Sequence, residues 1–143
     1  MTPVLRARDV RLRRGTREVL AGASFEVVRG GLVALMGASG SGKTTILRAV
    51  TALEEIHAGA IDVAGVTLTA GVPATETLRA VHRGVGLVFQ FHHLFEHLTV
   101  LGNVCLAPVH AYGLPPSQAE RRARELLARL ARRLEERWKA TSV

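Results

Sequence analysis

The sequence predicts an α/β fold, and three observations carry this prediction. A short unbroken apolar run, residues 32–36, is typical of a strand buried on both faces. A loop rich in glycine and serine follows that run, and the residues after the loop predict a helix over 45–53. Two segments before the run, 4–12 and 19–27, predict further strands, the first through a weak alternation of apolar and polar residues. Strand, loop and helix in this order are typical of α/β proteins.

The middle of the chain predicts a hairpin and one more buried strand. Residues 59–69 alternate again and predict a hairpin that turns at Ala64 and Gly65. Residues 85–89 form a second continuous apolar run of the buried type. For residues 90–113 we expect loop and a short helix.

A long helix is predicted for the last part of the chain. Ser117 opens it, and Ser117 with Glu120 forms a capping-box pattern. The apolar face expected for this helix comprises Ala123, Leu126, Leu127, Leu130, Leu134 and Trp138.

Length and composition exclude several classes of protein. The 143 residues suit one domain or part of one, and an apolar fraction of 48% is enough for a core. The single cysteine, Cys105, excludes an internal disulfide framework. No apolar stretch is long enough to span a membrane, and the first residues lack the apolar core of a signal peptide. We therefore expect a cytoplasmic protein without a membrane span of its own.

The formal net charge of +7 raises the question of an anionic partner. The basic excess lies at the two ends of the chain, within residues 1–31 and 117–143, where acidic residues are interspersed with the arginines. Richness in arginine and alanine with only two lysines is typical of the translation of a GC-rich gene, and this interpretation is favoured over a nucleic-acid patch, so we expect no nucleic-acid partner.

The glycine-rich loop carries the clearest chemical signal. Its residues match the Walker A pattern of glycine, four residues, then Gly-Lys-Ser/Thr: Gly37, Ala38, Ser39, Gly40, Ser41, Gly42, Lys43 and Thr44. Glycines let successive backbone N–H groups point at an anion, and the following helix adds its positive end. Lys43 can reach the β- and γ-phosphates of a nucleotide, and the Thr44 hydroxyl can ligate Mg²⁺. With Thr45, these residues form the predicted nucleotide site.

Other P-loop classes fit less well. A GTPase reads guanine with an Asn-Lys-x-Asp loop, but the chain's one asparagine, Asn103, is followed by Val104. A small-molecule kinase is compatible with the loop alone, although no lid of arginines is convincingly placed.

At this point the sequence resembles the ATPase domain of ABC transporters. The resemblance lies in the order of residues 19–25, the loop with Thr45, Leu53-Glu54-Glu55, and residues 85–90. The segment 91–104 is similar to the polar amino-acid importer branch. The resemblance to the family implies that residues 1–130 are an incomplete nucleotide-binding domain. This domain would contain part of a P-loop NTPase core, an N-terminal antiparallel β subdomain and the start of a helical subdomain.

Particular roles follow from this resemblance. Gln90 matches the Q-loop glutamine, which helps to hold Mg²⁺ and the attacking water. Residues 91–110 lie where a transmembrane permease subunit docks, and a second ATPase subunit is the other implied partner. Such a subunit lies in the cytoplasm, peripheral at the inner face of the cell membrane. Arg14 stands where an aromatic residue usually stacks on adenine, and a guanidinium can also stack on a base.

Three histidines near Gln90, namely His92, His93 and His97, raise the alternative of a metal site. No cluster of cysteines or acids joins them at ligand spacing, so surface or docking-loop histidines are the better interpretation.

Several family motifs are absent from the 143 residues. We find no Walker B strand ending in aspartate, no Leu-Ser-Gly-Gly-Gln signature and no switch histidine. Residues 131–143 form a basic helical tail unlike the family. The sequence therefore predicts a truncated chain that binds Mg-ATP without hydrolysing it. The alternative is a non-hydrolytic nucleotide-binding or assembly module whose basic helix, 117–139, binds a partner or RNA.

Overall fold

The computed structural model describes residues 2–91 and 94–141, with side chains as far as Glu135. It divides into two compact units, Met1–Val88 and Phe89–Val143, and each is described by itself.

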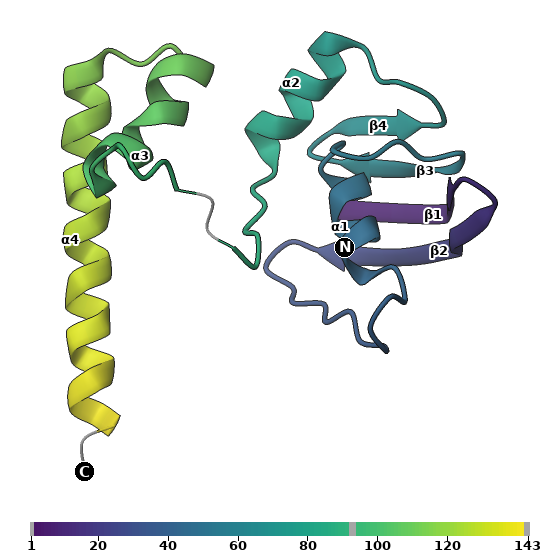
Figure 1. Cartoon of the computed structure of the whole chain (residues 1–143), viewed down its shortest axis with the longest axis horizontal. Coiled ribbons are helices and arrows are strands. Elements are labelled where there is room, and N and C mark those ends of the chain that lie inside the picture. Colours follow the sequence, from purple (N-terminus) through teal and green to yellow (C-terminus); the bar gives the residue numbers. More distant parts are fainter. Residues whose placement is uncertain (1, 92–93, 142–143) are drawn as a thin grey trace. The chain divides into compact units, whose positions relative to one another are not determined.

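The first unit is built on a four-stranded antiparallel sheet in the order β2-β1-β3-β4 (Figure 1). Its elements are β1 (Pro3–Arg14), β2 (Arg17–Val28), α1 (Lys43–Val50), β3 (Ala58–Val63), β4 (Val66–Thr69) and α2 (Thr75–Gly84). The two N-terminal strands, the helix after the loop and the hairpin turning at Ala64 and Gly65 are confirmed. The N-terminal antiparallel β subdomain is therefore present as expected.

A β-bulge at Asp9 explains why the alternation in the first strand is weak. Ala7 and Val10 are both buried although they are three residues apart, and the pairing register shifts between them. Asp9 has a positive φ of 45°, and its N–H donates to Ser24 Oγ at 2.9 Å. A β-carbon on Gly59 would lie 2.3 Å from the Asp9 carbonyl oxygen, so the neighbouring strand needs glycine here.

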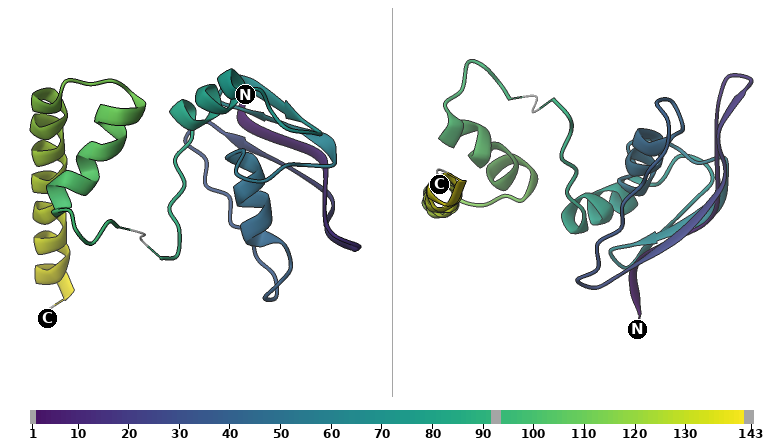
Figure 2. Two further views of the ribbon diagram at one scale, coloured as in Figure 1. Left: turned by 45° about the horizontal axis from the view of Figure 1, so that its top comes forward. Right: turned by 90° about the horizontal axis from the view of Figure 1, so that it is seen from below.

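The core of this unit lies between one face of the sheet and helix α1 (Figure 2). Alternate residues of the strands supply the sheet side of the core, because side chains two apart on a strand share a face. Helix α1 contributes Ile46, Ala49 and Val50, which follow the helical spacing of three and four. The first turn of α1, and with it the glycine-rich loop, is therefore anchored to the core.

The strand predicted for residues 32–36 is wrong. These residues have no regular secondary structure, and the side chains of Leu32 and Met36 are 97% and 89% exposed. A central parallel strand is stabilised by hydrogen bonds to strands on both sides. Within the part of the chain that the structure describes, the only sheet is β2-β1-β3-β4, and it does not include this segment.

The second buried strand, predicted for residues 85–89, is also wrong. The segment is irregular, and Val88 is 88% exposed. An apolar run shows that the composition of a segment suits a buried strand, but the segment forms a strand only when adjacent strands are present to pair with it.

Helix α2 was not anticipated from the sequence. It buries Val81 fully, and it contributes Leu78 as a half-buried side chain. Two apolar residues three apart are too few to show a helical period, which explains the omission.

The second unit is helical, as expected for residues 90–113 and for the last part of the chain. It contains α3 (Val100–Leu106), the π-helical turn η1 (Ala107–Ala111) and α4 (Pro116–Thr141). Figure 1 shows α3 beside the first half of α4, where Ala119 and Ala123 are buried.

The start of α4 differs from the prediction by one residue. The helix begins at Pro116, which suits the first helical position, and the Pro115 carbonyl accepts from the N–H groups of Gln118 and Ala119. Ser117 therefore lies inside the first turn instead of opening the helix. No described helix combines the length and apolarity that a membrane crossing requires.

Candidate functional site

The predicted phosphate loop ends where helix α1 begins. Gly42 precedes the helix with φ 91° and ψ 3°, which is a left-handed conformation. A β-carbon there would lie 2.9 Å from both the Val19 carbonyl oxygen and Leu20 Cδ2. Glycine is thus required for two reasons, the backbone conformation and the close approach of β2. The loop is pressed against the sheet at this point.

The Lys43 ammonium closes the loop on itself. Its Nζ donates to the carbonyl oxygens of Gly37 at 2.8 Å and Ala38 at 2.7 Å, and it lies 3.4 Å from Ser41 Oγ. The lysine is therefore held over the loop by the residues that begin it.

The two threonines that follow have different environments. Both line a cavity over the loop, but Thr44 is exposed, whereas Thr45 is buried at 6% exposure in the first turn of α1. Of the two threonines, Thr44 is thus the accessible one.

A cavity of about 470 Å³ lies over the loop, within the usual size range of small-molecule sites. Its lining comprises Arg14, Arg17, Val19, Ser39, Gly40, Gly42, Lys43, Thr44 and Thr45. The lining contains three basic side chains and no acidic one. Its charge and its hydroxyl groups suit a polyphosphate.

Arg14, the predicted adenine contact, lines this cavity but already has a partner. Its guanidinium donates to Glu54, from Nε to Oε1 at 2.8 Å and from Nη2 to Oε2 at 2.7 Å. Glu54 also forms an ion pair with Arg48, whose Nε lies 3.3 Å from Glu54 Oε2. The Arg14 side chain is therefore held in a bidentate contact with the Glu54 carboxylate. This contact uses the edge of the guanidinium group and leaves its two faces open for stacking.

Arg17 lines the same cavity and was missed by sequence reasoning. It lies on β2, two residues before Val19, which lines the cavity as well. The only sequence signal would have been the period of two along this strand.

Gln90 and the predicted docking segment belong to the second unit. Gln90 is exposed, and so are the apolar side chains of Phe91, Leu94 and Phe95, the first of them at 70%. Leu98 is half-buried. Of the segment 91–110, His92 and His93 lie outside the described residues. In the part that the structure covers, no three histidine, cysteine or acidic side chains are grouped to hold a metal ion.

Asn103 holds the turn that precedes α3. Its Oδ1 accepts from the Phe95 N–H at 2.8 Å, and its Nδ2 donates to the carbonyls of Phe95 and Thr99 at 3.1 and 3.0 Å. The backbone of residues 95–99 is therefore tied to the helix, and the exposed Phe95 side chain is presented from a fixed turn.

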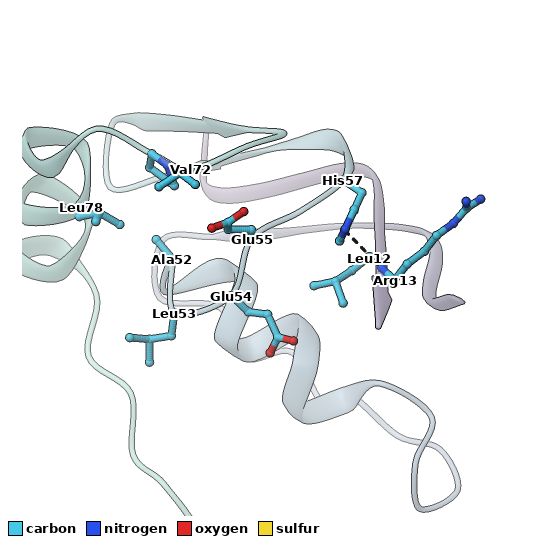
Figure 3. A pocket seen from close by; sticks show the side chains of 10 residues that line it. Leu12, Arg13, Ala52, Leu53, Glu54, Glu55, His57, Val72 and Leu78 are labelled. Atoms are coloured by element: carbon cyan, nitrogen blue, oxygen red, sulfur yellow. Dashed lines mark hydrogen bonds between the residues drawn. The ribbon is translucent and has the colours of Figure 1, made fainter. Parts of the chain in front are cut away.

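A second cavity of about 380 Å³ lies in the first unit (Figure 3). Its lining is mixed, with apolar side chains such as Leu12 and Leu78 beside Glu55 and His57. The dashed line in Figure 3 marks the Arg13 N–H donating to His57 Nδ1 at 3.3 Å. This bond joins β1 to the segment before β3, which is a structural role.

The loop that closes on Lys43, the helix that follows it and the adjoining sheet define a P-loop protein. A sequence profile described as ABC transporter matches residues 20–142. The chain therefore belongs to the ABC transporter family, as the sequence resemblance indicated.

Individual proteins agree with this assignment. The chain is 44% identical over 115 residues to the L-cystine transport system ATP-binding protein TcyN of Escherichia coli, a match spanning 78% of this chain and 46% of that protein. It is 40% identical over 116 residues to the glutamine transport ATP-binding protein GlnQ of the same organism, covering 81% and 47%. The chain thus spans about half the length of these curated relatives.

A solved structure supports the fold. The dimeric, post-hydrolysis state of the ATP-binding cassette MJ0796 bound to ADP and Pi matches with a TM-score of 0.72 and 27% identity. The match covers 87% of this chain and 56% of that one. The partial α/β P-loop core expected from the sequence is therefore confirmed at the level of the fold.

Proposed function

We propose that this chain is the ATP-binding part of an ABC transporter ATPase subunit whose intact form couples ATP hydrolysis to the import of a polar solute, an amino acid by its relatives. The cavity over residues 37–45 carries this proposal, because it combines a glycine-rich loop, Lys43 and the exposed Thr44. The names of relatives that transport cystine, glutamine and arginine support the solute class.

ATP with Mg²⁺ is the proposed ligand. The residues present fit it, since glycine is required at the loop's closest approach to the sheet and the cavity lining is basic. Residues 37–45 would hold the phosphates, and Thr44 and Gln90 would hold the Mg²⁺. Arg14 would stack on the face of the adenine base. The bound ion would supply charge neutralisation at the phosphates. Lys43 would exchange at least one of its carbonyl partners for a phosphate oxygen.

The proposed partners are permease subunits in the membrane and a second ATPase subunit. The exposed apolar side chains of Phe91, Leu94 and Phe95 support docking through residues 91–110, because apolar surface on a held turn suits a protein contact. The dimeric state named for the matching structure supports the second partner. The proposed location is the cytoplasmic face of the cell membrane.

We expect these 143 residues to bind ATP without turning it over. Walker B, the signature and the switch histidine do not occur in the sequence, and Gln90 alone is assigned to the reacting water. The domain division at residue 130 is part of the same proposal.

Calorimetric titration of the purified chain with Mg-ATP tests this function. We expect saturable binding, a loss of at least about tenfold in Lys43→Ala, and no phosphate release above the Lys43→Ala background. If Mg-ATP binds equally well to the wild type and to Lys43→Ala, the proposed nucleotide site at the loop is contradicted. If the wild type turns ATP over robustly and Lys43→Ala does not, the proposal that the chain does not hydrolyse ATP is contradicted.

A second candidate function is an assembly module that uses the helix 117–139. The leucines at positions 126, 130 and 134 of α4 are each at least half exposed, which favours a partner along this face. If the partner is RNA, binding must weaken with salt and with Arg-to-Gln changes in α4.

A further inference from the structure

Two arginines face each other at the mouth of the loop cavity. Arg14 ends β1 and Arg17 begins β2, and they are paired directly across the hairpin. Like charges opposite each other on neighbouring strands repel, and a nearby anion relieves this repulsion.

Only one of these charges is compensated. Arg14 is bound to Glu54, whose side chain is just 17% exposed and which also pairs with Arg48. Among the described residues, Arg17 has neither a hydrogen bond nor an ion pair from its side chain to an acidic group. The uncompensated charge at the cavity mouth is therefore that of Arg17.

The strand directs Arg17 toward the loop. Arg17 and Val19 both line the cavity, whereas the residue between them, Glu18, lies 3.7 Å from Arg11. This is the alternation of a β-strand. On the loop side, a β-carbon placed on Gly40 would lie 4.0 Å from Arg17 Nη2. The guanidinium thus lies next to the middle of the phosphate loop.

We propose that Arg17 is a nucleotide-binding residue that donates to the phosphate chain of the nucleotide held by the loop. This inference rests on the proposed function and adds a residue that the loop pattern does not contain. The ligand class is a nucleoside di- or triphosphate. A guanidinium beside a polyphosphate makes charge-assisted hydrogen bonds, and these also relieve the repulsion from Arg14.

The test compares Arg17→Ala with Arg29→Ala in the full chain. Both changes remove one positive charge from an exposed position, but Arg29 does not line the cavity. Calorimetric titrations use Mg-ATP, tripolyphosphate and adenosine, and thermal melts verify that each variant folds. We expect Arg17→Ala to bind Mg-ATP and tripolyphosphate about tenfold more weakly than the wild type, with the affinity for adenosine unchanged. Arg17→Lys should recover part of the loss.

The outcomes separate this inference from the proposed function. If the wild type binds Mg-ATP and Arg17→Ala binds it as tightly as Arg29→Ala does, the role of Arg17 is contradicted while the phosphate site stands. A loss in Arg17→Ala that is equal for adenosine and Mg-ATP also contradicts a phosphate contact. If the wild type binds none of the three ligands, both proposals fail.

Discussion

At the scale of single residues, the loop is held by contacts that its own sequence supplies. Lys43 binds the carbonyls of Gly37 and Ala38, and Gly42 lets the chain pass close to β2. The Walker A pattern could be predicted from the sequence because the Lys43 contacts are local, with partners six and five positions away along the chain. Arg17 could not, because its place over Gly40 depends on how β2 lies against the loop.

Replacement of Gly42 tests the close approach of the loop to β2. Gly42→Ala must adopt φ 91° and also meets the Val19 carbonyl at 2.9 Å. The backbone strain alone costs about 1–3 kcal/mol, and the steric contact adds to it. Urea unfolding followed by circular dichroism should show this loss, and calorimetry should show weaker Mg-ATP binding.

Gly30→Ala is the matched control for that variant. Gly30 has φ 75°, but a β-carbon there has no neighbour within 4 Å. It should lose stability through strain alone and keep its nucleotide affinity. If Gly42→Ala is no more destabilised than Gly30→Ala, the contact with β2 is not as tight as described.

At the scale of elements, local pattern predicted the antiparallel strands and the helices but not the pairing of the apolar runs. The strands β1 to β4 alternate, and the pairings of β1 with β2 and of β3 with β4 join strands that follow each other along the chain, so their sequences contain most of the information needed. Residues 32–36 and 85–89 read as strands because of composition, yet neither pairs within the described sheet. Helix α2 was missed because the large apolar side chains on its buried face are only those of Leu78 and Val81.

The exposure of residues 32–36 gives a direct prediction. Leu32 is 97% exposed, so Leu32→Ala should change the free energy of unfolding by no more than about 0.5 kcal/mol. Ile61→Ala, at a fully buried site of β3, should cost about 2–5 kcal/mol. Both are measured by urea unfolding of the full chain. A cost for Leu32→Ala close to that of Ile61→Ala would mean that the run is buried, as the sequence first indicated.

At the scale of the whole molecule, the proposed functions are divided between two compact units. The phosphate loop, Arg14 and Arg17 lie in Met1–Val88, whereas Gln90 and the exposed apolar side chains near it lie in Phe89–Val143. The first unit carries the proposed phosphate and adenine contacts, and the second carries Gln90, the proposed Mg²⁺ contact, together with the proposed partner contacts.

The most direct test of the central claim is an amide-resolved nuclear magnetic resonance titration of the full chain with Mg-ATP. If the loop binds the nucleotide, we expect the amide signals of residues 37–45 to shift most and to saturate together. The side-chain signal of Arg17 should shift with them. Lys43→Ala should remove these shifts. No shift at millimolar Mg-ATP, or shifts confined to helices α3 and α4, would contradict a nucleotide site at the loop.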